Sequence, residues 1–306
     1  MEAPLSELPA LARFAEELGY TDVWSLESDA LDGFTPLAAV AAVTEHVRLG
    51  TAIIPAWTRP AGLLAMHAAA MAELAPGRFV LGLGSSTEVV VQQWLDVPFS
   101  RPLTRTQRGG ARCPFTSERP ARERMKLRRP PRERVPIYIA ALGPKMLRLA
   151  GEVGEGVVFF LCGPRIIPEL LTQVGGDVDS VARLIVLPGS GNEVRLAARR
   201  GIVTYALVPY YARSLARQGF GDEVAAIGAA WHSGDREAAA GQVSDAMVAE
   251  LLLTGTEEQI GERLAAYRQA GLRTPVLAIG GVEPHRAGDA GLRRLLEAFA
   301  PARAVG

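Results

Sequence analysis

The chain has 306 residues, of which 48% are hydrophobic and 6% aromatic, so it is long and apolar enough to bury a sizeable core. Basic and acidic residues balance at 33 each, which gives no reason to expect a nucleic acid or a membrane surface as a partner. No apolar run reaches the roughly 18 residues of a membrane span, and no secretion signal opens the chain, so the cytoplasm is the expected location.

Residue types that hold metals or form disulfides are sparse. Cys113 and Cys162 are the two cysteines and form no CxxC pair, so neither a disulfide framework nor a zinc site is predicted. The histidines lack metal-ligand spacing, and we interpret all of them as structural or exposed. A GxSxG turn is also absent, so hydrolase chemistry of that type has no support. The histidines are His46, His67, His232 and His285.

The first part of the chain alternates between helical and strand patterns. Apolar residues at helical spacing predict a helix over 5–18, which Gly19 ends. A second helix is predicted over 61–74, between two apolar segments typical of strands covered on both faces. The strands predicted in this part are 22–26, 47–54 and 78–83.

A glycine-rich turn, Gly82–Ser86, follows strand 78–83. Small residues at the carboxyl end of a parallel strand let backbone N–H groups approach an anion closely. The sequence is not a GxGxxG dinucleotide motif, because its sixth position is Thr87. A helix is predicted after the turn, as far as Trp94.

The segment 105–134 differs in composition from the rest. It holds ten arginines and one lysine against three glutamates, and prolines at 114, 120, 130 and 131 predict an irregular structure without a long helix. A solvated loop, a short out-of-frame reading of the gene and a nucleic-acid arm are the three interpretations. The arm ranks last because hardly any aromatic residue accompanies the charges.

The second part of the chain contributes four more predicted strands, which brings the total to seven. Helices are expected between them, including a long helical region over 192–218 that Pro209 bends or divides. The strands are 135–140, 156–160, 181–187 and 275–279, and the other helices are 145–153, 239–253 and 257–270.

The segment LGTAIIPAWTRPAGLLAMHAAAMAELAPGRFVLGLGSS at 49–86 resembles the core of the bacterial-luciferase-like monooxygenase superfamily, and specifically its deazaflavin (coenzyme F420) dependent oxidoreductases. Five further segments agree with this family in the same order. They are AEELGYTDVWSLE (15–27), FTPLAAVAAVTEHVRLG (34–50), PFSRPLTR (98–105), PIYIAALGPKMLRLAGEVGEGV (136–157) and GTEEQIGERLAAYRQAGLRTPVL (255–277).

The resemblance implies an α/β fold, a single luciferase-like TIM (β/α)8 barrel over residues 1–306, with a helical excursion before the last strand. Such a barrel begins with a strand before its first helix, whereas only residues 1–4 precede the helix predicted here. With seven strands placed where a closed barrel has eight, the first strand is expected to be missing because the sequence starts late. Assembly of the protein into a homodimer is one option that the sequence leaves open.

The resemblance also implies where the chemistry lies. Glu27 occupies a position that is commonly acidic in the family, and Ser28 stands where many members carry a catalytic histidine. A non-prolyl cis peptide is expected between Ala52 and Ile53, against the deazaflavin ring. The residues expected to serve catalysis are Glu27 and Trp57. Those expected to bind the cofactor are Ala52, Ile53, Ile54, Gly84, Ser85, Ser86, Thr87, Ala141, Leu142 and Gly143.

The function implied is hydride transfer between coenzyme F420 and a small organic substrate such as an alcohol, an aldehyde or an enone, without a metal. Two alternatives stay open: a flavin mononucleotide (FMN) dependent monooxygenase on the same fold, and a non-catalytic deazaflavin-binding barrel, which Ser28 makes plausible. Tyr205, Tyr210 and Tyr211 in the helical excursion are candidates for the walls of the substrate pocket.

Overall fold

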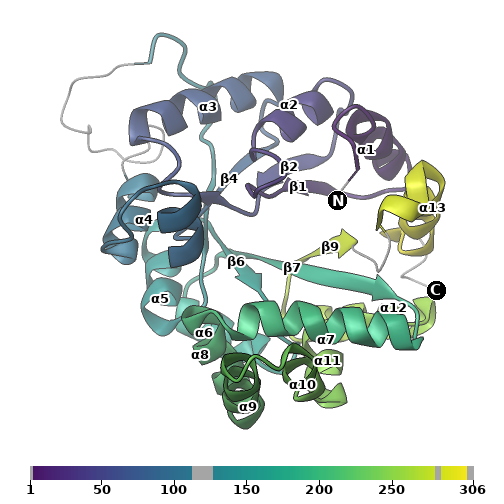
Figure 1. Ribbon diagram of the computed structural model, residues 1–306. Coiled ribbons are helices and arrows are strands. Elements are labelled where there is room, and N and C mark those ends of the chain that lie inside the picture. The colour runs from purple at the N-terminus through teal and green to yellow at the C-terminus, as the bar shows by residue number, and fades with distance from the viewer. Residues whose placement is uncertain (1–2, 112–126, 280–283, 302–306) are drawn as a thin grey trace. The chain divides into compact units, whose positions relative to one another are not determined.

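The computed structural model describes residues 3–111, 127–279 and 284–301 of the chain (Figure 1). These residues group into two compact units. Of the described residues, the amino-terminal unit comprises 4–111, 127–158, 174–179 and 300–301, and the carboxyl-terminal unit comprises Ala3, 159–173, 180–279 and 284–299. The prediction of one domain over the whole chain stays a prediction.

The amino-terminal unit alternates helices with parallel strands. Its elements are α1 (Leu8–Glu17), β1 (Asp22–Ser25), α2 (Thr35–Ala41), β2 (Arg48–Thr51), β3 (Ile54–Pro55), α3 (Ala61–Leu74), β4 (Phe79–Gly84), the π-helical η1 (Val90–Trp94), α4 (Pro102–Ala111), β5 (Ile137–Ala140), α5 (Pro144–Val153) and the start of β6 (Gly156–Phe160). The strands pair in the order β1, β2, β4, β5, β6, and β3 pairs with β4. All of these pairs are parallel, so the carboxyl ends of the strands share one edge.

The carboxyl-terminal unit contains the end of β6 and a three-stranded parallel arrangement with β7 in its centre. Its remaining elements are α6 (Ile167–Val174), β7 (Asp179–Pro188), α7 (Asn192–Ala206), α8 (Pro209–Leu215), the π-helical η2 (Ala216–Phe220), α9 (Gly221–His232), α10 (Arg236–Gly241), α11 (Asp245–Leu251), β8 (Leu253–Gly255), α12 (Glu257–Gln269), β9 (Thr274–Ile279) and α13 (Pro284–Ala298). β7 pairs with β8 on one side and with β9 on the other.

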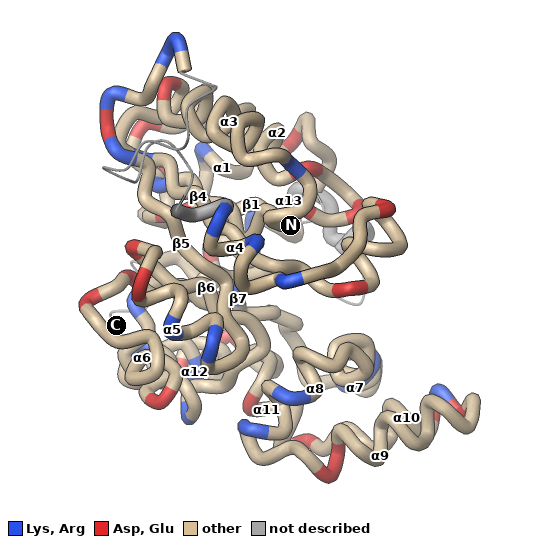
Figure 2. The backbone as a smooth tube through the Cα atoms, turned by 90° about the vertical axis from the view of Figure 1, so that its left-hand side faces the viewer, with Lys and Arg blue, Asp and Glu red and all other residues tan. Residues whose placement is uncertain are grey.

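Each unit has an apolar core of its own. In the amino-terminal unit, Leu49, Leu81 and Ile137 lie on adjacent strands and are fully buried, as expected for parallel strands covered on both faces. In the carboxyl-terminal unit, a second core lies among the helices between β7 and β8, around Ile202 and Met247. Figure 2 shows charges of both signs scattered over the elements rather than gathered in one place.

The α/β class with parallel strands and intervening helices is confirmed. α3 has the predicted bounds, 61–74, and the helical region after residue 192 is divided at Pro209, where α8 begins. No strand lies between Ala3 and the start of α1 in the described chain. The expectation of a further strand upstream stays a prediction.

Two predicted segments were wrong in detail, and one short strand was missed. The strand predicted over 47–54 is divided into β2 and β3, because Ala52 and Ile53 between them lie outside the strand ladder and pairing with β4 resumes at Ile54. The helix predicted over 239–253 is divided into α10 and α11, since Ser244 caps a new helix by accepting a hydrogen bond from the N–H of Met247, and Leu253 already belongs to β8. β8 is only three residues long, which is too short for a periodic signal.

The segment predicted as irregular, 105–134, begins within a helix. α4 runs from Pro102 to Ala111, with a proline in its first turn and with Thr106 fully buried, and it contacts α5 and β4. Tertiary contact on one face therefore stabilises a helix that lacks an apolar repeat. Residues 127–134 have no helix or strand, and Arg129 and Arg134 form ion pairs with Glu73 and Glu155. Residues 112–126, including Cys113, lie outside the described chain.

Candidate functional site

An ion pair joins the loops that follow β1 and β2. Glu27 accepts hydrogen bonds from the Arg59 guanidinium at 2.7 and 2.5 Å, and from the backbone N–H of Gly33 at 3.2 Å. The side chains of Glu27 and Arg59 are only 10% and 13% exposed. Arg59 also stacks on the ring of Phe34, 5.0 Å from its centre. The carboxylate of Glu27 is thus already held by groups of the chain, at the edge where β1 and β2 end.

Asp32 lies at the outer side of this ion pair. Its carboxylate accepts hydrogen bonds from the backbone N–H groups of Phe34 and Thr35 at 2.8 and 3.0 Å, and it lies 3.9 Å from Arg59. Burial acts to raise the pKa of Asp32, but hydrogen bonds from Thr35 and Phe34 and the charge of Arg59 hold it below its ordinary value. Ser28 accepts a hydrogen bond from a backbone N–H two residues on, within the same loop.

The peptide bond between Ala52 and Ile53 is cis, as the resemblance implied. Backbone hydrogen bonds fix both of its sides, since the N–H of Ala52 donates to Ser25 at 2.7 Å and the carbonyl of Ile53 accepts from Glu27 at 3.3 Å. Ile53 is half-buried, whereas the side chain of Ile54 is fully buried. Of these two expected cofactor contacts, Ile53 therefore has side-chain surface that a cofactor could touch, whereas the side chain of Ile54 has none.

The glycines of β4 allow the backbone of β2 to approach closely. A Cβ atom on Gly82 would lie 1.7 Å from the carbonyl oxygen of Thr51, and the buried hydroxyl of Thr51 bonds to both the N–H and the carbonyl of Gly82 at 2.9 Å. A Cβ atom on Gly84 would lie 2.9 Å from the side chain of Ile53. Both glycines are thus required by neighbouring atoms of the chain.

The turn Ser85–Thr87 follows β4 and is held by Trp57. The indole N–H of Trp57 donates to the carbonyl of Ser85 at 2.8 Å, and Arg105 stacks on the indole at 5.1 Å. Trp57 is 6% exposed, so its position favours a role in holding the turn over a direct contact with substrate. Ser86 has a φ of 55°, an uncommon backbone conformation for a residue other than glycine.

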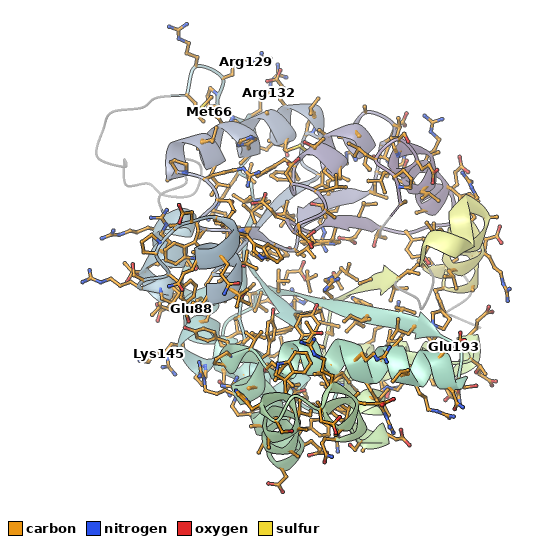
Figure 3. The ribbon with its side chains drawn as sticks, viewed as in Figure 1. Met66, Glu88, Arg129, Arg132, Lys145 and Glu193 are labelled. Carbon is orange, nitrogen blue, oxygen red and sulfur yellow. The ribbon has the colours of Figure 1, made fainter. Side chains whose placement is uncertain are left out.

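The helix α5 starts directly after β5 and its first turn is uncapped. Gly143 is the N-cap residue, in an extended conformation, and it provides no side-chain cap. Pro144, the first residue of the helix, has no N–H, and the N–H of Met146 donates to the carbonyl of Gly143 at 2.9 Å. Ala141 is buried and donates to the carbonyl of Val158 at 3.1 Å. Lys145 is exposed in the first turn of the helix, and Figure 3 shows its side chain projecting away from the ribbon.

The turn Ser85–Thr87 and the start of α5 follow neighbouring parallel strands, because Leu83 of β4 is paired with Ile139 of β5. Both therefore lie at the same edge, together with the Glu27–Arg59 pair and the Ala52–Ile53 peptide. The predicted residues of the amino-terminal unit are brought to one edge by this topology. A helix N-terminus beside a turn of small residues is an arrangement that can bind an anion.

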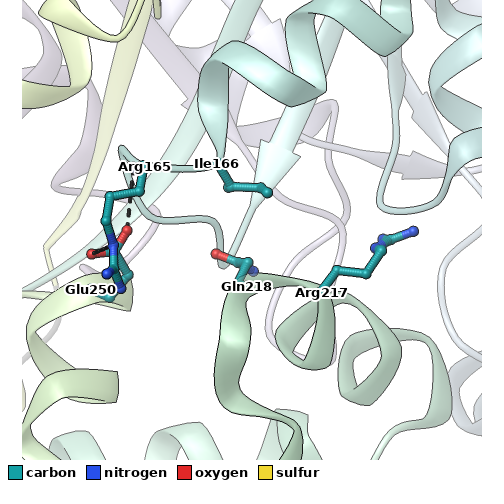
Figure 4. A pocket seen from close by; sticks show the side chains of 5 residues that line it. All are labelled: Arg165, Ile166, Arg217, Gln218 and Glu250. Carbon is teal, nitrogen blue, oxygen red and sulfur yellow. Dashed lines mark hydrogen bonds and ion pairs between the residues drawn. The ribbon is translucent and has the colours of Figure 1, made fainter.

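The carboxyl-terminal unit has a separate hollow of about 200 Å³, lined by Arg165, Ile166, Arg217, Gln218 and Glu250 (Figure 4). Gln218 bridges the loop after β6, because its amide donates to the carbonyl of Leu161 and accepts from the N–H of Gly163, each at 2.9 Å. The buried Glu250 pairs with Arg165 at 2.9 Å. None of the predicted site residues lines this hollow, and its polar groups hold the loop in place.

Cys162 lies in the same loop and is buried, and burial raises the pKa of its thiol to about 12. A thiol of that kind stays protonated and unreactive at neutral pH. Among the described residues, no group of three or more histidine, cysteine, aspartate or glutamate side chains is arranged to hold a metal ion.

A polar cluster at the amino-terminal ends of the strands was missed at the sequence level. Arg48 donates to Asp22 at 2.5 Å, to Asp179 at 2.7 Å and to the hydroxyl of Tyr138 at 3.0 Å. Burial, followed by the hydrogen bond to Asp179, raises the pKa of Tyr138. No spacing in the sequence could have found this cluster, since up to 131 positions separate its hydrogen-bonded residues.

The parallel sheet with helices between its strands, the cis peptide after β2 and the glycines of β4 define the class of protein as an α/β protein of the luciferase-like barrel fold. The model of the luciferase-like monooxygenase family matches residues 1–274. The chain belongs to this family.

The chain is 26% identical to a Mycobacterium tuberculosis protein provisionally named a coenzyme F420-dependent oxidoreductase, over 90% of this chain and 91% of that protein. A solved structure of the coenzyme F420-dependent tetrahydromethanopterin reductase from Methanopyrus kandleri shares the fold, with a TM-score of 0.77 at 18% identity, over 98% of this chain and 95% of that one. An F420-dependent secondary alcohol dehydrogenase, solved with an F420–acetone adduct, has a TM-score of 0.69 at 16% identity, over 100% and 96%.

Within the described residues, no helix combines the length and apolar character that crossing a bilayer requires.

Proposed function

We propose that this protein is a coenzyme F420-dependent oxidoreductase that transfers a hydride between the deazaflavin and a small organic substrate, of the alcohol, aldehyde or enone type. One observation carries the proposal: the Ser85–Thr87 turn and the uncapped start of α5 follow paired strands at one edge of the sheet. Membership of the luciferase-like family and the names of the relatives support it.

The chemistry of this edge fits a cofactor that carries a phosphate. The start of α5 has no side-chain cap, and a helix N-terminus favours an anion through its dipole and through the N–H groups that are left without a helical partner, here those outside Pro144 and Met146. Ser86, in its left-handed conformation, turns the chain between Ser85 and Thr87. This turn follows β4, the strand that pairs with the strand before α5. We assign the phosphate-bearing chain to these residues, together with Ala141, Leu142 and Gly143. Bound coenzyme F420 would supply the hydride chemistry.

The chain itself positions the cofactor and the loops around it. Ile53 presents a half-buried side chain that Gly84 allows to lie against β4, and we assign this surface to the ring system. Trp57 fixes Ser85 through its indole N–H, and Glu27 fixes Arg59 at the mouth. In this proposal Glu27 and Trp57 act by positioning other groups, and the paired loops keep water from the reacting atoms.

A titration of the purified protein with coenzyme F420 and with FMN tests the proposal. Tight binding of F420, with loss of its absorbance when a substrate such as a secondary alcohol is added, is the expected result. Binding of FMN in preference to F420 would support the monooxygenase alternative instead. Binding of F420 without turnover over a panel of alcohols, aldehydes and enones would favour the non-catalytic barrel.

Two N-cap glycines provide a matched test of the anion site. Gly143 precedes α5 and Gly191 precedes α7, and both are extended, while a Cβ atom on Gly191 would meet nothing within 4 Å. Gly143→Val should weaken F420 binding by about tenfold or more, because a β-branched side chain would cover the first N–H groups of α5. Gly191→Val should leave it unchanged. Equal F420 affinity in the two variants would contradict the assignment.

A further inference from the structure

One half-buried arginine in the carboxyl-terminal unit, Arg183, has no charged partner among the residues that the structure describes. Arg183, in β7, stacks on the ring of Phe160, with 4.9 Å between the guanidinium carbon and the ring centre. Throughout the described part of the chain, no carboxylate or carbonyl oxygen accepts a hydrogen bond from it. Other half-buried arginines do have such acceptors, namely Arg48, Arg59, Arg78, Arg199 and Arg263.

Two tyrosines lie near Arg183 and Phe160. The rings of Phe160, Tyr205 and Tyr211 meet edge to face, with centres 5.0 to 5.8 Å apart. Neither tyrosine hydroxyl has a hydrogen-bond partner among the residues that the structure describes. Burial raises the pKa of Tyr211 to about 12, while the nearby charge of Arg183 acts to lower it, so this hydroxyl is a neutral donor at physiological pH.

The cluster is built on a rigid support. Tyr205 and Tyr211 come from consecutive helices, α7 and α8, and both pack against the apolar core of the carboxyl-terminal unit. Arg183 and Phe160 come from strands. A cation and two hydroxyl donors are thus held among aromatic rings, and no residue in the described ranges supplies an acceptor for them. A half-buried guanidinium left in this state gains most from a planar anion that can accept two hydrogen bonds.

We infer that Arg183, Phe160, Tyr205 and Tyr211 form a binding site for a planar organic carboxylate, whose carboxyl group pairs with Arg183 while its conjugated or aromatic part packs on the tyrosine rings. The site itself follows from the carboxyl-terminal unit alone. That the carboxylate belongs to the substrate, an aromatic or unsaturated acid, rests on the proposed function.

The test is calorimetric titration of the full-length protein with trans-cinnamate and benzoate, each compared with its uncharged amide. The wild type should bind each acid at least about tenfold more tightly than the amide, because only the acid offers a charge-assisted pair. Arg183→Gln should remove this preference. Arg213→Gln is the matched control, since Arg213 stacks on Tyr210 at 4.7 Å but is exposed, and it should keep the preference.

Further variants separate the outcomes. Tyr211→Phe should weaken acid binding by about threefold, with an unchanged melting temperature as evidence that it folds. If the wild type does not prefer the acids, or if Arg183→Gln and Arg213→Gln behave alike, the inference is wrong. If Arg183→Gln instead lowers F420 affinity, the carboxylate belongs to the cofactor and the substrate assignment is wrong. Failure of the protein to bind F420 would overturn the proposed function and leave the acid-binding result standing.

Discussion

Arg59 and Arg183 are half-buried arginines in different units that stack on a phenylalanine at almost the same distance. The guanidinium carbon lies 5.0 Å from the ring centre of Phe34 in one case and 4.9 Å from that of Phe160 in the other. Arg59 is paired with the carboxylate of Glu27, whereas Arg183 has no acceptor within the described chain. Stacking alone therefore does not decide the role of an arginine. The carboxylate of Glu27 fixes Arg59 as a link between two loops. Arg183 has no such carboxylate among the described residues, and its guanidinium can therefore pair with a ligand.

Removal of the charge at Glu27 should produce the largest effect. Glu27→Gln leaves the Arg59 guanidinium, 13% exposed, without its counter-charge, and we expect the free energy of unfolding to fall by about 2 kcal/mol. Arg183→Gln loses only a stacking contact and should cost about 0.5 kcal/mol or less. Urea denaturation of both variants beside the wild type measures the difference.

The double variant Glu27→Gln with Arg59→Gln provides the control for this prediction. It should be more stable than Glu27→Gln alone, because no uncompensated charge remains. If Glu27→Gln proves as stable as Arg183→Gln, the ion pair does not stabilise the loops and the contrast between the two arginines fails.

A carboxylate introduced beside Arg183 should make it resemble Arg59. Val276 of β9 is paired in register with Arg183 of β7, so their side chains lie on one face of the sheet. Val276→Glu should lower the affinity for trans-cinnamate by about tenfold, since the new carboxylate occupies the guanidinium. Titration calorimetry checks this. Val276→Gln, of similar size but uncharged, should have a smaller effect, and Val276→Glu should add nothing in an Arg183→Gln background.

The smallest effect is expected at Asp32, the outer carboxylate near Arg59. Its pKa in the folded protein lies below the ordinary value, so its carboxylate contributes stability above pH 4 or so, and this contribution is lost as the pH falls through the lower folded pKa. Because the side chain is 41% exposed, Asp32→Asn should cost only about 0.5 kcal/mol at pH 7.

Melting temperatures of the wild type and of Asp32→Asn should therefore differ at pH 7 and converge as the pH approaches 2. The exposed neighbour Asp29 offers a control, since Asp29→Asn should match the wild type at both pH values. A difference between the wild type and Asp32→Asn that persists at pH 2 would have to come from something other than the charge of Asp32.

The local pattern of the sequence was sufficient for most elements of the fold. The bounds of α3 and the break at Pro209 follow from helix formers and prolines, which act within a few residues of themselves. Strands β4 and β6 were predicted correctly because short apolar runs are typical of parallel strands that are covered on both faces. The cis peptide at Ala52–Ile53 came from the resemblance to a family, and no propensity would have revealed it.

What only the tertiary structure decided is which side chains meet. Glu27 and Arg59 are 32 positions apart on two loops, and their pairing depends on β1 and β2 being parallel neighbours. The helix α4 forms within an arginine-rich segment because one face is buried against α5 and β4, which its composition does not indicate. Arg183 shows the limit most clearly. Its sequence neighbours predict only a strand, whereas its lack of an acceptor among the described residues depends on which residues folding brings near it.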